Sequence, residues 1–192
     1  HTIAIFGQGY VGLPLSLSFA IHGCQVIGVD SNRELAESLK NGITYQTEKY
    51  QGTSIREILK RKLADGSYTV STDGAWAVQQ ADTVIITVGL PVIAGDPLYD
   101  YLESACTLIA ENLKQDMLIL IRTTVVPGTT ESFCIPLLEK IYGLRAGHDF
   151  YVAYIPERIA EGKAFDEFEN MPTIIGACDE ESMRRAVEVI RI

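Results

Sequence analysis

The chain has 192 residues, is 47% hydrophobic and 21% charged, and carries a formal net charge of −9. This is the composition of an ordinary globular protein, long enough for one generous domain or for one domain and part of another. The acidic balance disfavours a nucleic-acid partner, because a nucleic-acid backbone is held by clustered Lys and Arg. A bound nucleotide is compatible with it, since backbone N–H groups at a helix N-terminus can hold phosphates.

Short apolar runs alternate with helical patterns along the chain. In chain order, the pattern predicts strand 2–6, helix 11–21, strand 25–30, helix 33–40, helix 55–63, strand 68–71, helix 74–80, strand 82–88, helix 99–113, strand 117–122, helix 129–142, strand 151–154, strand 173–175 and helix 180–192. Residues 91–97 are a predicted loop, and 158–168 a loop or irregular segment. This alternation predicts an α/β fold of the Rossmann type, a doubly wound and mainly parallel sheet with helices on both faces.

The chain shows no membrane, secretion or metal-site pattern. Its longest nearly apolar stretch, near 117–126, is interrupted by Arg122 and is too short to span a bilayer. A strand is already predicted at residue 3, which argues against a signal peptide. The four cysteines are Cys24, Cys106, Cys134 and Cys178. No two of them form a C-x-x-C pair, so we expect buried or half-buried thiols in a reducing compartment, no metal site and a cytoplasmic protein.

The first strand leads into the sequence Gly7-Gln8-Gly9-Tyr10-Val11-Gly12, which matches G-x-G-x-x-G. The pattern is specific here because it follows a predicted strand and opens a predicted helix. Gly7 would permit the tight turn, Gly9 the approach of a pyrophosphate, and Gly12 close packing of helix on strand. The N–H groups of Tyr10 and Val11 would then face the phosphates.

Asp30 ends the second predicted strand, 18 residues after Gly12 (30 − 12), where the acidic residue of the fingerprint is expected. A carboxylate there accepts hydrogen bonds from a ribose diol and repels a 2′-phosphate, which favours NAD over NADP. Arg33 favours NADP instead, because an Arg at this position accommodates a 2′-phosphate. The Arg33 side chain would equally lie over the adenine or the ribose edge. The alternative role for Asp30 is a cap on the second helix.

Ligands of Rossmann sheets bind at the carboxyl ends of the strands, so the residues that follow each strand are candidates. Val88 closes strand 82–88 and is a candidate cofactor contact. Thr123 and Thr124 offer hydroxyls, and Glu157 and Glu161 offer carboxylates that suit general-base chemistry. The alternatives are strand-end caps for the threonines and solvated loop carboxylates for the glutamates.

Three segments resemble the nucleotide-sugar 6-dehydrogenases, the family of the UDP-glucose, UDP-N-acetylmannosamine and GDP-mannose enzymes. They are Gly-Gln-Gly-Tyr-Val-Gly-Leu-Pro-Leu at 7–15, Thr-Thr-Val-Val-Pro-Gly-Thr-Thr at 123–130 and Pro-Glu-Arg-Ile-Ala-Glu-Gly-Lys-Ala at 156–164, with support from Met-Pro-Thr-Ile-Ile-Gly at 171–176. The resemblance runs from residue 2 to about 176.

The resemblance implies that a sugar C6 alcohol is oxidised twice, through an aldehyde and a thioester, to a carboxylate with two NAD. By position, Thr124 matches the Thr that holds the catalytic water and also contacts the cofactor. Glu157 matches the family's Pro-Glu carboxylate, which acts as acid and base in the thioester and hydrolysis steps. Glu161 matches a residue of the family that lies near the nicotinamide. Arg158 stands where UDP-glucose enzymes usually have Phe. We therefore expect Glu157, Arg158 and Glu161 to face a UDP-sugar, best a UDP-N-acetylhexosamine such as UDP-N-acetyl-D-mannosamine.

Two departures from the family pattern matter. Leu90 replaces the usual Thr before Pro91, which removes a hydroxyl near the cofactor. The nucleophilic Cys, the Lys and the Asn of the family lie beyond residue 192, so this part alone is expected to bind NAD without turnover. We expect an NAD-binding domain at 1–176, and at 177–192 the start of a helix that leads to a central helix and a substrate domain. A frayed natural C-terminus is the alternative.

The resemblance also implies a homodimer in the full-length protein. Three other functions remain as alternatives at this stage. They are a UDP-glucose 6-dehydrogenase, a two-domain β-hydroxyacid dehydrogenase and a non-enzymatic NAD-sensing module. The second shares the glycine motif but offers no reason for Pro-Glu-Arg together with Thr-Thr-Val-Val-Pro-Gly.

Overall fold

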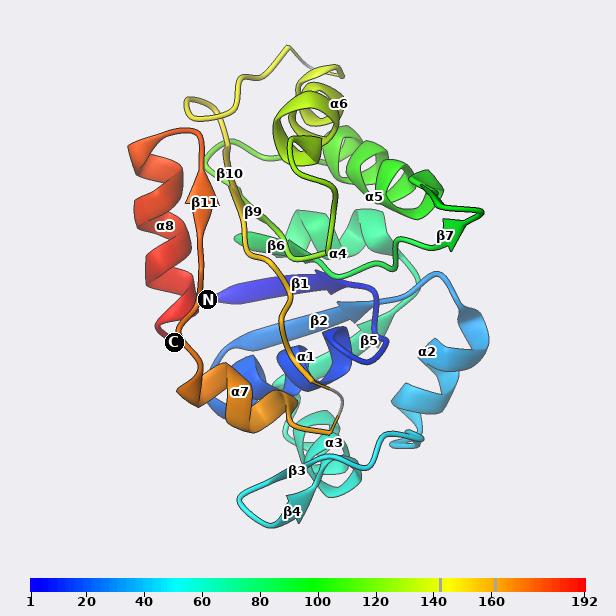
Figure 1. The fold of residues 1–192 in the computed structure, drawn as a ribbon. Coiled ribbons are helices and arrows are strands. Elements are labelled where there is room, and N and C mark those ends of the chain that lie inside the picture. The colour runs from blue at the N-terminus through cyan, green and yellow to red at the C-terminus, as the bar shows by residue number, and fades with distance from the viewer. Residues whose placement is uncertain (142, 161) are drawn as a thin grey trace.

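A single large sheet forms the centre of the computed structural model, which describes residues 1–141, 143–160 and 162–192 (Figure 1). Its strands are β1 (Thr2–Phe6), β2 (Gln25–Val29), β5 (Tyr68–Ser71), β6 (Thr83–Ile86), β9 (Leu118–Ile121), β10 (Tyr151–Tyr154) and β11 (Gly176–Ala177). They lie side by side in the order β11–β10–β9–β6–β1–β2–β5. All neighbours are parallel except β11, which runs antiparallel to β10.

This strand order confirms the predicted doubly wound α/β fold. From β1 the chain first builds outward through β2 and β5, and it then returns to add β6, β9 and β10 on the other side of β1. The direction of winding therefore reverses between β1 and β6, and a crevice opens there at the carboxyl ends of the strands. In folds of this kind, ligands bind in that crevice.

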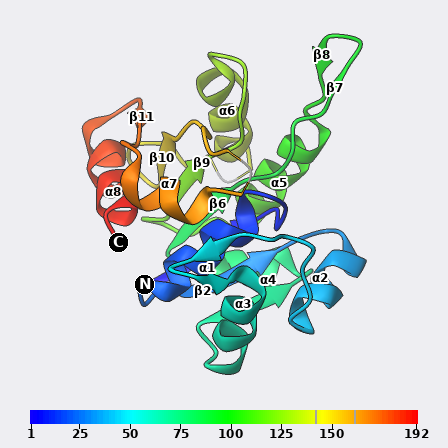
Figure 2. The ribbon, with the colours of Figure 1, turned by 60° about the horizontal axis from the view of Figure 1, so that its bottom comes forward.

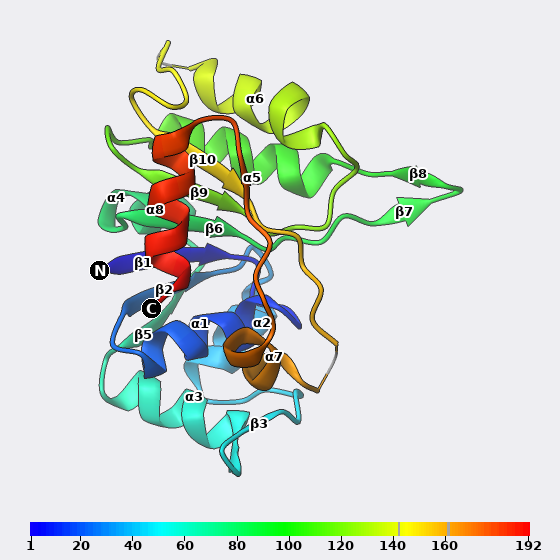
Figure 3. The same cartoon turned by 60° about the vertical axis from the view of Figure 1, so that its left-hand side comes forward.

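Helices cover both faces of the sheet. They are α1 (Gly12–Ile21), α2 (Arg33–Lys40), α3 (Ile55–Ala64), α4 (Gly74–Gln80), α5 (Asp100–Glu111), α6 (Ile135–Glu139), α7 (Ala164–Asn170) and α8 (Glu180–Ile190). Side chains of α1, α3, α7 and α8 share one core cluster, and those of α4, α5 and α6 share the other. The ribbon shows these two groups of helices on opposite faces of the sheet (Figures 1 and 3).

Each central strand contributes to both cores. In β1, Ile3 and Ile5 point to the α1 side, while Ala4 and Phe6 point to the α5 side. Successive side chains of a strand face opposite ways, so a strand covered on both faces must be apolar throughout. This is why the apolar runs of the sequence predicted these strands well.

The predicted loop at 91–97 is instead a hairpin of β7 (Val92–Ile93) and β8 (Asp96–Pro97) that projects from the body (Figures 2 and 3). Its turn residues Ala94 and Gly95 have φ of 54° and 96°. Two positive φ values define the mirror-image turn that suits the twist of a two-stranded hairpin. The sequence signal was weak because Ala rarely takes this conformation, for which Asn and Asp are the usual residues.

The segment 158–168, predicted to be irregular, contains the start of α7. This helix has only seven residues and depends on tertiary contacts: Phe165 is buried and its ring lies 5.5 Å from that of Tyr50. Short helices are marginal without such contacts, so their sequence signal is weak. Tyr50 belongs to a further hairpin, β3 (Lys49–Tyr50) with β4 (Thr53–Ser54), in the region that the sequence left unassigned.

Two other predicted elements differ in extent. The helix expected at 129–142 begins as a π-helical turn at Thr130–Cys134 and continues as α6 only to Glu139, while Tyr142 lies outside the described residues. Pro136 lacks the N–H that a regular helix would need there. The strand expected at 173–175 forms later, at Gly176–Ala177, where the backbone pairs with β10. The last helix, α8, packs on β9 and β10.

Candidate functional site

The turn between β1 and α1 brings the three fingerprint glycines together at the switch point. Gly7 has a φ of +90°, and a Cβ on it would lie 2.9 Å from the carbonyl oxygen of Thr87. A Cβ on Gly12 would lie 1.7 Å from the carbonyl oxygen of Gly7. Gly9 differs, because a Cβ there would meet nothing within 4 Å. Open space therefore lies over Gly9 at the N-terminus of α1, where helix N–H groups favour an anion.

A buried side chain, Gln8, supports this turn from below. Its Nε2 donates to the carbonyl of Ile5 over 2.8 Å. Its Oε1 accepts hydrogen bonds from the hydroxyl of Ser16 at 3.1 Å and from that of Tyr68 at 2.7 Å. Burial raises the pKa of Tyr68, which keeps its hydroxyl protonated as a donor. Gln8 was not predicted as a site residue, because the fingerprint leaves its position unspecified.

Asp30 follows β2 and faces the same turn. Its Oδ2 accepts from the N–H of Gln8 at 2.7 Å, and its Oδ1 accepts from the N–H of Asn32 at 2.9 Å. Asp30 is not the helix cap considered above. The N-cap of α2 is Asn32, whose side chain accepts from the N–H groups of Glu34 and Leu35. The carboxylate of Asp30 thus stays at the mouth of the crevice.

A cavity of about 560 Å³ opens beside Asp30. Its lining includes Gly7, Val88, Tyr101 and Leu108. A carboxylate beside apolar and aromatic walls suits an adenosine, whose ribose carries a diol and whose base is flat and largely apolar at its faces. Arg33 is exposed on α2 and is not among the residues that line this cavity. Tyr101 was not predicted, because it lies on a helix that the fingerprint does not include.

A second cavity, of about 210 Å³, lies on the other side of the glycine turn. Most of its lining comes from the residues that follow β6 and β9. The glycine turn and the segment after β10 add one residue each. The lining residues are Val11, Thr87, Val88, Gly89, Leu90, Arg122, Thr123, Thr124 and Glu157. We call it the nicotinamide-end cavity, after the end of the cofactor that is expected beside Thr123 and Thr124 from the sequence. Val88 and Gly89 line both cavities, so the two cavities adjoin each other in the crevice.

The two neighbouring threonines of this cavity differ in exposure. The Thr123 hydroxyl donates to the carbonyl of Val88 over 2.8 Å, so it joins the ends of β9 and β6. Thr124 is exposed at the cavity. The strand-end role therefore belongs to Thr123, and Thr124 presents the hydroxyl that is open to a ligand.

Glu157 is largely shielded from solvent, in contrast to the solvated loop carboxylate that was its alternative. Its side chain is 10% exposed, and its Oε2 accepts from Nε of Arg122 over 2.9 Å. Its Oε1 accepts from the N–H of Ile159 over 2.6 Å. Arg122 was noted in the sequence only as an interruption of an apolar stretch, so its part in the site was missed. A charged residue that ends a buried strand was the available signal.

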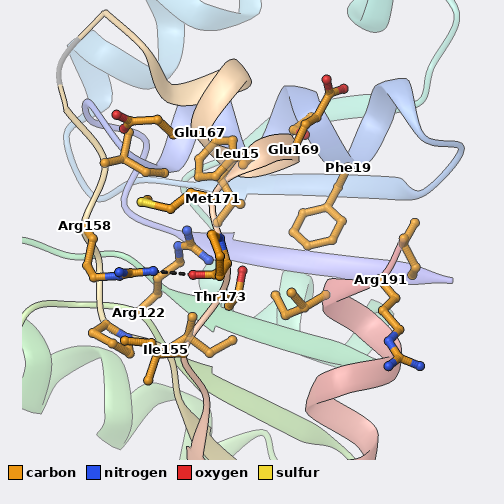
Figure 4. A pocket seen from close by; sticks show the side chains of 18 of the residues that line it. Leu15, Phe19, Arg122, Ile155, Arg158, Glu167, Glu169, Met171, Thr173 and Arg191 are labelled. Atoms are coloured by element: carbon orange, nitrogen blue, oxygen red, sulfur yellow. Dashed lines mark hydrogen bonds between the residues drawn. The ribbon is translucent and has the colours of Figure 1, made fainter.

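Arg158 points away from the nicotinamide-end cavity. It lines a neighbouring cavity of about 410 Å³ and donates to the carbonyl of Pro172 (Figure 4). Adjacent residues thus serve different cavities, Glu157 the first and Arg158 the second. Glu161 lies outside the described residues. The N–H of the next residue, Gly162, donates to Glu48 over 3.2 Å, which ties this connection to the segment before β3.

The remaining predicted cofactor contacts lie at the start of α1. Val11 lines the nicotinamide-end cavity. Tyr10 is half exposed, and its ring meets that of Tyr45 edge-on at 5.6 Å between centroids. The Tyr10 side chain therefore faces outward, while its backbone belongs to the glycine turn.

The cysteines lie outside both ends of the crevice. Cys24, Cys106 and Cys134 are buried as expected, but Cys178 is exposed, because it follows the short edge strand β11. Within the described part of the chain, no group of three or more His, Cys, Asp or Glu side chains is arranged to hold a metal ion. A search of the same residues finds no helix with the length and apolar character needed to cross a membrane.

Comparison with known proteins identifies the domain. Residues 1–192 match the NAD binding domain of the UDP-glucose/GDP-mannose dehydrogenase family. The chain belongs to this family. The match decides against the β-hydroxyacid dehydrogenase alternative, and NAD is the cofactor of the domain.

Two curated family members illustrate the similarity. The UDP-N-acetyl-D-mannosamine dehydrogenase of Pyrococcus horikoshii is 36% identical over 189 residues, which cover 98% of this chain and 44% of that protein. The GDP-mannose 6-dehydrogenase of Pseudomonas syringae pv. tomato is 36% identical over 185 residues, covering 94% and 41%. The chain thus spans less than half the length of these relatives.

A solved structure of the family has the same fold. The structure of the Pyrococcus horikoshii UDP-D-ManNAc dehydrogenase superposes with a TM-score of 0.92 at 35% identity, covering 100% of this chain and 44% of that one. The crevice fits NAD, because open space lies over Gly9, a carboxylate lines the larger cavity and polar strand ends line the smaller one. Leu90, which replaces the family's usual Thr, lines the smaller cavity.

Proposed function

We propose that this chain is the cofactor-binding part of a nucleotide-sugar 6-dehydrogenase, which oxidises a sugar C6 alcohol to a carboxylate with two NAD. The observation that carries the proposal is the nicotinamide-end cavity, which is lined by both the exposed Thr124 and the largely buried carboxylate of Glu157. A dinucleotide-binding module without chemistry would have no need for a buried carboxylate at that end. Further support comes from membership of the family.

In this proposal NAD supplies the hydride acceptor, and side chains of this chain arrange the proton transfers around it. The pyrophosphate lies over Gly9 and the backbone of Tyr10 and Val11, and Asp30 binds the adenosine ribose. Thr124 holds the catalytic water. Glu157 gives or takes a proton in the thioester and hydrolysis steps. Val88 and Glu161 contact the nicotinamide end of the cofactor.

The substrate we propose is a UDP-sugar, most specifically UDP-N-acetyl-D-mannosamine. Arg158 after the Pro-Glu pair supports an N-acetylhexosamine, as does the name of the relative from Pyrococcus horikoshii. Glu157, Arg158 and Glu161 are the proposed substrate contacts, and Arg33 a contact at the adenosine edge. UDP-glucose is the alternative substrate.

We further propose that a central helix with the Lys and Asn and a substrate domain with the nucleophilic Cys follow α8. The share of the relatives that this chain covers supports that arrangement. We also propose that the full-length protein is a cytoplasmic homodimer that binds neither nucleic acid nor membranes.

The decisive experiment is an NADH assay of the full-length protein with UDP-N-acetyl-D-mannosamine, UDP-N-acetyl-D-glucosamine and UDP-glucose. The expected result is oxidation of an N-acetylhexosamine with two NADH formed per sugar. One NADH per sugar would contradict a four-electron oxidation, and a clear preference for UDP-glucose would overturn the assignment from Arg158. NAD binding without oxidation of any sugar would instead favour the sensing module.

A further inference from the structure

One charged side chain, Arg122, forms part of the wall between two cavities. It lines both the nicotinamide-end cavity and the neighbouring cavity of about 410 Å³ that also receives Arg158 (Figure 4). Its side chain is only 9% exposed. It follows β9 directly, and its backbone N–H is bonded to the carbonyl of Ile86 in the adjacent strand over 2.9 Å. The backbone at Arg122 is therefore fixed by its hydrogen bond to the central strand β6.

The tip of Arg122 is held by two other elements. Its Nε donates to Oε2 of Glu157 over 2.9 Å, and the guanidinium lies over the ring of Phe168 of α7, 5.1 Å from the centroid. The second oxygen of Glu157 accepts from the N–H of Ile159. Both oxygens of the carboxylate are thus held, one by a guanidinium and one by the backbone. The carboxylate keeps one orientation at the wall of the nicotinamide-end cavity.

A buried ion pair is a poor device for stability alone, because desolvation of both charges offsets their attraction. What the ion pair does provide is a fixed orientation of the carboxylate. A small misplacement of a reacting group lowers the rate of a reaction strongly. We infer that Arg122 is a positioning residue that holds the Glu157 carboxylate at the nicotinamide end, with the Phe168 ring as its support. This inference rests on the proposed function for the role of Glu157 in proton transfer.

Turnover of the full-length enzyme gives the first test. Arg122→Met is expected to lower kcat by about a hundredfold, because the carboxylate loses its orientation, while the Kd for NAD is unchanged. Arg122→Lys restores part of kcat, since it returns a cation. In a Glu157→Gln background, Arg122→Lys changes nothing further, because the group it positions is already lost. Parent-like kcat in Arg122→Met would overturn the inference.

The matched control is Arg185. It also combines an ion pair with an aromatic contact, to Glu181 at 2.7 Å and to the ring of Tyr151 at 3.8 Å, but on α8. Arg185→Met removes the same groups away from both cavities and is expected to leave kcat unchanged. An equal loss of kcat in the two Met variants would assign Arg122 a general structural role and refute positioning.

Chemical rescue separates position from packing. The 410 Å³ cavity gives small molecules access to the place of the missing side chain in Arg122→Ala. Added ethylguanidinium is expected to raise kcat of Arg122→Ala in a saturable manner and to leave that of Glu157→Gln unchanged. Absence of rescue, with Arg122→Lys as inactive as Arg122→Met, would overturn the inference.

A spectroscopic readout distinguishes failure of this inference from failure of the proposed function. The Nε–H resonance of Arg122 in the 192-residue chain, assigned through Arg122→Lys, is expected to be protected from exchange and to lose that protection in Glu157→Gln. NAD is expected to shift it, and ADP-ribose, which lacks the nicotinamide, to shift it less. These results would support the positioned pair even if no sugar were oxidised. If the Nε–H resonance is unprotected from exchange and does not shift with NAD, the positioned pair is refuted, even if the full-length enzyme oxidises a sugar.

Discussion

The backbone N–H of Gln8 donates to the carboxylate of Asp30 over 2.7 Å, so the glycine turn is fixed to the end of the neighbouring strand. The acidic residue of the fingerprint thereby holds the turn, and in the proposed function it also binds the ribose of the cofactor. The side chain of Gln8 is held from the other side by Tyr68. Turn, acid and tyrosine form one connected polar network beneath the proposed cofactor site.

Replacement of Asp30 tests the ribose contact. Asp30→Ala is expected to weaken NAD binding about 10- to 100-fold, the value of a hydrogen bond to a charged group. Calorimetry with NAD and with ADP-ribose measures it, and both ligands are expected to lose affinity equally, because both carry the adenosine ribose. Glu37→Ala is the control, since it removes an exposed carboxylate on α2 that does not line the cavity beside Asp30, and its NAD affinity is expected to stay near that of the parent. Unchanged binding in Asp30→Ala would contradict the ribose role.

Loss of the Tyr68 hydroxyl tests the support of the turn. Tyr68→Phe is expected to lower the free energy of unfolding by about 1 kcal/mol, because Gln8 loses one of its two donors in the buried core. Urea denaturation measures the change. Tyr99→Phe serves for comparison, since its hydroxyl makes only a 3.3 Å contact with Thr129 and a smaller loss is expected. Equal stability of Tyr68→Phe and the parent would mean that the network adds nothing.

The sequence predicted the sheet because its strands are buried on both faces and hence apolar throughout, as in β1 and β6. It predicted the glycine turn because the backbone geometry itself requires Gly7 and Gly12. Elements that rest on distant partners escaped it. The helix α7 forms where Phe165 meets Tyr50, and no local pattern carries that contact.

The site shows the same division. Asp30 and Glu157 were predicted as site residues because their positions after strands are meaningful in any Rossmann sheet. Gln8 and Arg122 were missed, since their value lies in the groups they hold, Tyr68 and Glu157, which are far away in sequence. A polar residue that interrupts an apolar strand end is the sign that would have found Arg122.

Acid stability offers a test on α8. Hydrogen bonds from Arg184 and Arg185 lower the pKa of Glu181 to about 2, from an ordinary value of 4.5. A folded-state pKa below the unfolded one adds stability above pH 4.5, and this contribution is lost as the pH falls through about 2. Glu181→Gln is therefore expected to flatten the fall of the urea midpoint between these pH values. Glu180→Gln, which removes the same charge outside the arginine pairs, is the control; if it flattens the curve equally, the pairs are not the cause.

Gly9 and Gly12 allow folding and cofactor binding to be separated. Gly12→Ala would drive a Cβ to 1.7 Å from the Gly7 carbonyl, so it is expected to destabilise the fold by about 1–3 kcal/mol. Gly9→Ala has room for its methyl group and is expected to keep the parent Tm. That methyl occupies the space proposed for the pyrophosphate, so NAD affinity is expected to fall sharply. Thermal unfolding with calorimetry on both variants measures the contrast, and a Gly9→Ala variant that binds NAD as well as the parent would exclude close approach of the phosphates at Gly9.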